Sequence, residues 1–226
     1  MCSDLKKITE QNNFNFLLLA LVLFLLLGAV VEQFQMTHGQ RLIQASTVVT
    51  IALGLWSFRE TRHSRLSGIG QFFAILILFT FSLFLDMEGL DYIHLCLMIG
   101  FFAWSTWLAA RQVLFTGSIT GHKITGAICI YLLLGMIWAL MYLLIAEAVP
   151  EAFNGLHQAP WYENFSALSY FSFVTLTTLG YGDISPRLAI PKFLAYMEAV
   201  VGVLYIAILV ASLIGARMSE RNSSSD

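Results

Sequence analysis

Long apolar stretches recur along this chain, and they decide the environment in which it can fold. Each is close to the roughly 20 residues that cross a bilayer core as a helix. There are six, at residues 14–31, 42–58, 69–85, 92–110, 124–146 and 193–214. Only 12% of all residues are charged, about half the usual share in soluble domains. The pattern predicts an all-α membrane protein with six transmembrane helices.

The distribution of charge predicts how these helices are oriented, because cytoplasmic segments are enriched in lysine and arginine. If both termini are cytoplasmic, nine of the 12 basic residues lie inside, and only Arg41, Arg187 and Lys192 lie outside. The first stretch ends at Glu32 rather than at a small-residue cleavage site, so we interpret it as a retained helix and not a secretory signal. We expect a multi-pass protein of the plasma (cell inner) membrane with both termini in the cytoplasm.

The connection between the fifth and sixth stretches differs from the other four, which are short and polar. It covers residues 147–192 and contains a half-length apolar segment from 164 to 177. The segment runs into Thr177-Thr178-Leu179-Gly180-Tyr181-Gly182-Asp183. Non-helical backbone at membrane depth is stable only where protein buries it or water lines it. This arrangement predicts a re-entrant pore helix followed by a loop, and therefore a pore.

The segment from Thr177 to Asp183 resembles the selectivity filter of potassium channels, where backbone carbonyls replace the hydration shell of the ion. The resemblance is specific over residues 161–215 and loose over 124–146. Before residue 124 only the number of predicted spans agrees with the family. It implies a filter made of Thr178, Leu179, Gly180, Tyr181 and Gly182, in which the carbonyls of the first four hold K⁺. It also implies a homotetramer, because one chain supplies one of the four filter strands. K⁺ is then the permeant ion, and we expect no cofactor.

The residue types in the filter segment suit this task. Gly180 and Gly182 adopt positive φ at little cost, so alternate peptides can turn their oxygens in one direction. Thr178 adds a hydroxyl at the inner end. Leu179 stands where the family more often has Val or Ile, which alters the packing behind the filter. The pore helix ends at the filter, so we expect its carbonyl pole to favour a cation nearby.

Residues around the filter are expected to support it: Thr177, Asp183, Tyr170, Phe171, Val174 and Glu198. Many relatives carry paired Trp at the positions of Tyr170 and Phe171, one of which bonds the Asp after the filter, and Phe cannot donate that bond. Val174 stands where some two-span relatives carry Glu.

Glu198 is the only formally charged residue within the six stretches. An ionisable group inside a membrane needs a partner or water. One interpretation is a hydrogen bond to the pore helix or filter, at Thr175 or Thr177, with Glu198 as a neutral acid. The other is an interfacial carboxylate that reaches water.

The last stretch also contains candidates for gating. Gly202 is either a hinge or a site of close helix packing, since glycine inside a helix costs about 1 kcal/mol relative to Ala. Ile206, Val210 and Ile214 recur at helical spacing and either form a hydrophobic constriction or face lipid. The fourth stretch lacks the row of Lys or Arg on which a membrane field acts. We expect no steep voltage dependence.

The domain organisation follows from these assignments. We divide the chain into a cytoplasmic tail (1–13), a four-helix, voltage-sensor-like but uncharged peripheral domain (14–110), a cytoplasmic linker (111–123), a pore domain (124–214) and a second cytoplasmic tail (215–226). The pore domain comprises an outer helix, the pore helix, the filter and an inner helix.

Passive K⁺ conduction is the expected function, with membrane lipids as the surroundings. A weakly selective cation pore, a non-conducting scaffold subunit and a six-span carrier are the alternatives. Carriers usually show internal repeats and charges near the midplane, and an enzyme would need a nucleophile–base pair or metal cluster. Neither pattern is visible in the sequence, and we expect no enzyme. A net charge of -2 without a long basic run argues against nucleic-acid binding.

Overall fold

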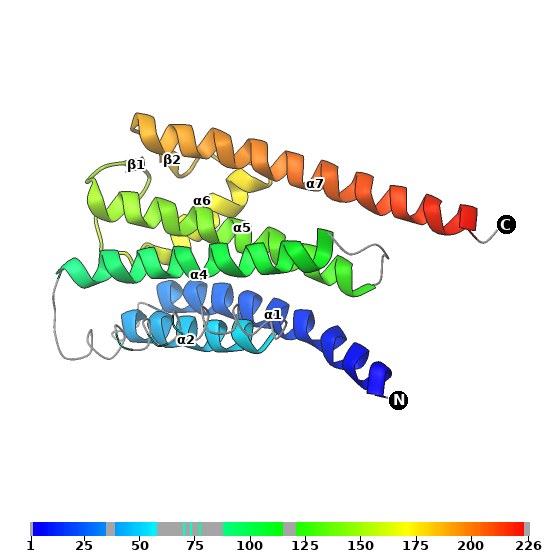
Figure 1. The fold of residues 1–226 in the computed structure, drawn as a ribbon. Coiled ribbons are helices and arrows are strands. Elements are labelled where there is room, and N and C mark those ends of the chain that lie inside the picture. The colour runs from blue at the N-terminus through cyan, green and yellow to red at the C-terminus, as the bar shows by residue number, and fades with distance from the viewer. Residues whose placement is uncertain are drawn as a thin grey trace.

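The computed structural model is built almost entirely of helices (Figure 1). It describes residues 2–34, 39–57, 70, 73, 77, 88–114 and 121–223. The helices are α1 (Cys2–Gln33), α2 (Gly39–Ser57), α4 (Glu88–Leu114), α5 (Gly121–Ala148), α6 (Phe165–Leu176) and α7 (Ala189–Ser223). Two short strands, β1 (Phe153–Asn154) and β2 (Ser185–Pro186), pair antiparallel. The predicted all-α class is confirmed.

Four of the described helices are long and apolar enough to cross a bilayer. Their apolar parts are Phe14–Gln33 in α1, Asp91–Val113 in α4, Ile124–Ala148 in α5 and Ala189–Ser212 in α7. They correspond to the first, fourth, fifth and sixth predicted spans. The third predicted span, residues 69–85, lies almost wholly outside the described residues, so the total of six stays a prediction.

The second predicted span is shorter than expected. Its apolar part in α2 is Arg41–Gly54, which falls below span length. Polar side chains lower its hydropathy, and Gln44, Thr47 and Thr50 are buried in the bundle. The hydroxyls of Thr47 and Thr50 donate to the carbonyls of Ile43 and Ser46, both at 2.8 Å. Such bonds to the preceding turn satisfy hydroxyls without water.

The long helices lie alongside one another, and α6 crosses obliquely between α5 and α7 (Figure 1). The N- and C-termini lie at one end of the bundle, whereas the β1–β2 pair lies at the opposite end. Antiparallel α4 and α5 pack against each other, and α1 contacts α2, α5 and α6.

Helix α1 reaches α6 through aromatic packing. The rings of Phe24 and Phe165 lie 5.1 Å apart. A Cβ placed on Gly28 would come within 2.8 Å of the Phe165 ring, so the absence of a side chain there lets the two helices approach. The start of α6 is therefore held by α1 as well as by α5.

Candidate functional site

The candidate site begins with α6, which is too short to span a membrane. Its 12 residues are about 18 Å long, roughly 60% of a 30 Å bilayer core. Phe165 and Leu168 are fully buried. At the N-terminal end the Asn164 amide donates to the carbonyls of His157, at 3.1 Å, and Ala159, at 3.0 Å. These contacts hold the start of α6 to the preceding loop.

The C-terminal end of α6 organises the backbone that follows it. A helix normally leaves its last four carbonyls without intrahelical partners. In α6 each of the last four carbonyls accepts a hydrogen bond. The Phe173 carbonyl accepts from Thr177 N–H, the Val174 carbonyl from the N–H groups of Leu179 and Gly180, and the Thr175 carbonyl from Thr178 N–H. The Leu176 carbonyl accepts from the Tyr131 hydroxyl. We expected the carbonyl end of this helix to favour a nearby cation. In the structure, three of the four carbonyls accept hydrogen bonds from the backbone N–H groups of residues 177–180.

These bonds determine the direction of the filter carbonyls. Across a trans peptide, an N–H and the preceding C=O point in opposite directions, and no described peptide bond is cis. The N–H groups of Thr178, Leu179 and Gly180 point back at α6, with N···O distances of 2.9, 2.9 and 3.3 Å. The carbonyls of Thr177, Thr178 and Leu179 therefore point away from α6. We call this row the carbonyl strip.

Backbone torsions alternate from Thr178 to Gly182. Positive φ occurs at Thr178 (57°), Gly180 (60°) and Gly182 (80°), that is, at every second residue. The two glycines adopt it freely. The value at Thr178 was missed from the sequence, because a non-glycine residue in this region costs about 1–3 kcal/mol and needs support from its surroundings. Its N–H bond to the Thr175 carbonyl supplies part of that support.

The filter segment is open on the side away from α6. Residues 177–183 are all exposed in the single chain, including 56% of Leu179 and 66% of Tyr181. Among the described residues, nothing lies within 4 Å of a Cβ built on Gly180 or Gly182. One chain therefore does not cover its own carbonyl strip.

Aromatic side chains of α6 divide into two groups behind the filter. The Tyr170 ring stacks on Tyr181 with a 6.3 Å centroid separation and a 7° interplanar angle, and its phenol interacts with Asp183. Phe171 instead packs on Tyr142, at 5.0 Å, and on Phe153, at 5.7 Å. Tyr170 thus supplies the hydroxyl beside Asp183, and Phe171 packs in the hydrophobic core.

The loop before α6 supports the outer end of the filter segment. Gly155 has a φ of 76°, and a Cβ there would lie 2.0 Å from the Asp183 carbonyl oxygen. Only glycine permits this backbone approach. The β1–β2 pairing of Asn154 with Ser185 keeps the two segments together. Sequence analysis did not predict this contact between Gly155 and the filter segment.

Glu198 is fully buried, which rules out the interfacial carboxylate. Its partners are the hydroxyls of Tyr142 in α5 and Ser172 in α6, each 2.6 Å from a carboxyl oxygen. The contact with the pore helix is therefore made at Ser172, whereas Thr177 bonds its hydroxyl to the Phe173 carbonyl at 2.7 Å. Sequence reasoning missed Tyr142 and Ser172, since isolated hydroxyl residues in apolar helices carry no positional signal.

Gly202 packs closely on the end of α6. A Cβ there would lie 2.1 Å from the Leu176 carbonyl oxygen, and α7 continues through this position as one helix. This contact supports the interpretation of Gly202 as a site of close helix packing, and the hinge stays a prediction. Ile206, Val210 and Ile214 are exposed. Their exposure in the single chain agrees with both interpretations, a constriction in a pore and a surface that faces lipid.

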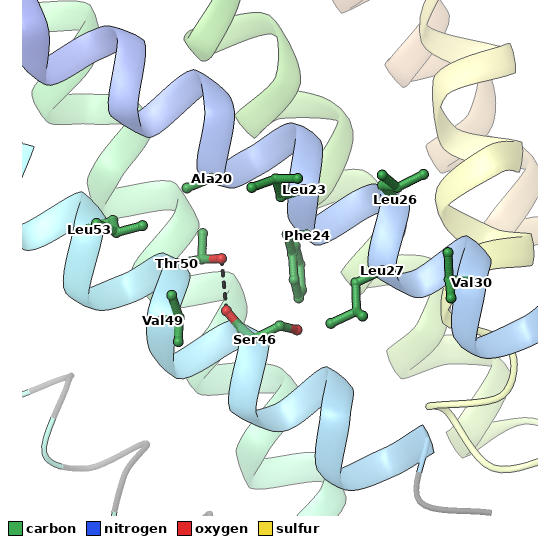
Figure 2. A pocket seen from close by; sticks show the side chains of 10 residues that line it. All are labelled: Ala20, Leu23, Phe24, Leu26, Leu27, Val30, Ser46, Val49, Thr50 and Leu53. Carbon is green, nitrogen blue, oxygen red and sulfur yellow. Dashed lines mark hydrogen bonds between the residues drawn. The ribbon is translucent and has the colours of Figure 1, made fainter. Parts of the chain in front are cut away.

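A cavity of about 380 Å³ lies away from this site, between α1 and α2 (Figure 2). Its lining is almost wholly apolar, and it contains no charged side chain. An ion path requires oxygens or charges in place of water. The cavity therefore offers no route for an ion.

Comparison with known proteins points to the same part of the chain. Residues 126–218 match a family model described as an ion channel. The match begins in α5, includes α6 and the carbonyl strip, and ends in α7. No curated protein and no solved structure matches the chain.

Proposed function

We propose that the ion channel domain at residues 126–218 forms a passive, K⁺-selective pore when four copies of the chain assemble around one axis. The carbonyl strip is the observation that carries this proposal. A potassium ion enters a pore only if protein oxygens replace its water at little net cost. The three carbonyls of the strip turn away from α6, and positive φ recurs at every second residue from Thr178 to Gly182, so such oxygens are available on the side that a shared axis would face.

Assembly supplies what a single chain lacks. The strip is irregular backbone at membrane depth, which lipid cannot solvate. The exposed side of α7, with Val203, Ile206 and Val210, leaves a second apolar surface uncovered. Four copies would enclose the strip around a water-filled axis and bury part of these α7 surfaces. Following the distribution of Lys and Arg, we assign the channel to the plasma membrane with both termini in the cytoplasm.

Reconstitution of the purified chain tests the proposal directly. We expect a particle of four 25.3 kDa chains, and planar-bilayer currents with a K⁺ permeability well above that of Na⁺. Gly180→Ala should abolish the preference for K⁺, because a Cβ at a φ of 60° costs about 1–2 kcal/mol and disturbs the strip. Gly89→Ala is the matched control, because its Cβ meets nothing within 4 Å.

Three results would contradict the proposal in different ways. A permeability ratio near one would indicate a weakly selective cation pore. Absence of flux from a well-folded particle would indicate a non-conducting subunit. A particle containing one chain would remove the shared axis on which the mechanism depends.

A further inference from the structure

Two short oxygen–oxygen contacts meet at Glu198, and a third joins its partner Ser172 to a backbone carbonyl. Together they allow the protons of this cluster to be counted. Tyr142 Oη lies 2.6 Å from Glu198 Oε2, and Ser172 Oγ lies 2.6 Å from Glu198 Oε1. Ser172 Oγ also lies 2.8 Å from the carbonyl oxygen of Gly135. Oxygens at such distances are held together by a proton between them. Three contacts therefore require three protons.

The two hydroxyls supply only two of these protons. If Glu198 were ionised, Tyr142 and Ser172 would both donate to the carboxylate, and the Ser172 and Gly135 oxygens would face each other without a proton. If Glu198 carries the third proton, every contact is satisfied. The acid donates to Ser172 Oγ, Ser172 donates to Gly135, and Tyr142 donates to Oε2.

Within the part of the chain that the structure describes, no positively charged group acts on Glu198 to stabilise a carboxylate. No Lys, Arg or His occurs in residues 124–146, 165–176 or 193–214. The titratable groups that act on Glu198 are two phenols of α5, Tyr142 and Tyr131. On the α6 side, Tyr170 interacts instead with Asp183 and Tyr181. A fully buried ionised acid without a cation is strongly disfavoured.

We propose that Glu198 is a positioning residue of the pore, held as a neutral acid whose proton ties α7 to α6 and, through Ser172, to α5. The proton chain reaches Gly135, against which the Phe173 ring packs: a Cβ on Gly135 would lie 2.4 Å from that ring. Phe173 also supplies the carbonyl that accepts the Thr177 N–H at the start of the carbonyl strip. Loss of the proton would loosen the support of the filter. This consequence for conduction rests on the proposed function, whereas the protonation state does not.

Infrared spectroscopy of the reconstituted full chain tests the protonation state without any current. We expect a neutral carboxylic acid band at pH 7 that Glu198→Gln removes and Glu163→Gln leaves in place. Glu163 is an exposed acid near the start of α6 and serves as the matched control. Identical carboxylic acid bands in the wild type and in Glu198→Gln would overturn the assignment.

The pH dependence of the current tests the positioning role. We expect wild-type current to be maintained at neutral pH and to fall as rising pH removes the proton. Glu198→Gln should conduct and lose this alkaline fall, because the amide is neutral, donates to Ser172 and accepts from Tyr142. Tyr142→Phe should move the midpoint of the fall to higher pH, because the phenol donates to the carboxylate and favours the ionised form.

Glu198→Ala separates positioning from simple packing. It leaves the buried Tyr142 hydroxyl without an acceptor and Ser172 bonded to Gly135 alone, and should reduce current about tenfold relative to Glu198→Gln. An alkaline fall that is unchanged in both Glu198→Gln and Tyr142→Phe would overturn the positioning role. If the infrared result holds but no K⁺ current is found at any pH, the protonated acid stands and the proposed function fails.

Discussion

Three glycines allow close contacts among α5, α6, α7 and the loops between them. Gly155, Gly202 and Gly135 each face an atom within 2.5 Å of where a Cβ would be, and these atoms belong to Asp183, Leu176 and Phe173. Two of the three contacts are with backbone oxygens of the filter segment or of the end of α6. Because backbone moves less easily than a flexible side chain, these glycines are packing requirements rather than sites of general flexibility.

The first prediction concerns Gly202. We expect Gly202→Ala to lower the thermal stability of the purified protein, by roughly 1–3 kcal/mol for an overpacked contact, although Ala is otherwise the better helix former. Gly215→Ala is the matched control in the same helix, because its Cβ meets nothing within 4 Å. It should be neutral or slightly stabilising in a fluorescence-monitored thermal unfolding experiment. Equal stability of the two variants would show that α7 does not press against Leu176.

At the scale of elements, α4 is linked to the end of α5 and to the loop between α5 and α6. Trp161, which is buried, donates its indole N–H to Asp91 of α4 at 3.0 Å and packs on the His94 ring at 5.3 Å. The Tyr92 hydroxyl donates to the carbonyl of Glu147 at the end of α5, at 3.1 Å. A movement of α4 would therefore be transmitted to the loop that leads into α6.

The second prediction tests this link. Trp161→Phe keeps an aromatic ring but removes the donor to Asp91, so we expect a loss of roughly 1–3 kcal/mol in unfolding free energy. Trp107→Phe, on the exposed face of α4, should change stability by less than about 0.5 kcal/mol. In a double-mutant cycle, Asp91→Ala should add little to Trp161→Phe, since each substitution removes the same hydrogen bond. Fully additive effects would show that the two side chains do not interact.

At the scale of the whole molecule, α4 lacks the row of basic residues on which a membrane field would act. In α4 the basic residue of the last turn is Arg111, and residues 92–110 contain no Lys or Arg. The electric field does about 2.3 kcal/mol of work per charge per 100 mV, and only on charge that moves. Helix α1 contacts α5 and α6, and α4 contacts α5.

The third prediction follows from this arrangement. The dependence of conductance on membrane potential should correspond to less than about one gating charge per subunit. Arg111→Gln should leave that dependence unchanged, because Arg111 is exposed at the end of α4. Currents recorded over a range of potentials in a planar bilayer provide the measurement. A gating charge of several units per subunit would mean that charge elsewhere in the chain crosses the field.

The sequence alone determined the properties that depend on neighbouring residues. Apolar length predicted the all-α class and four helices that are long and apolar enough to cross a bilayer, because every backbone group in lipid must be bonded within its own helix. The Thr177–Asp183 segment indicated the channel domain, and its glycines indicated where φ becomes positive.

Only the tertiary structure decided the contacts between distant segments. The hydroxyls that hold Glu198 lie 26 and 56 residues away along the chain, in two other helices, so no local pattern within one helix relates them to it. The direction of the carbonyl strip depends on how residues 178–180 fold back on α6, and Thr178 adopts positive φ only because that fold supports it. Local patterns encode the elements, whereas these contacts arise when α5, α6 and α7 pack together.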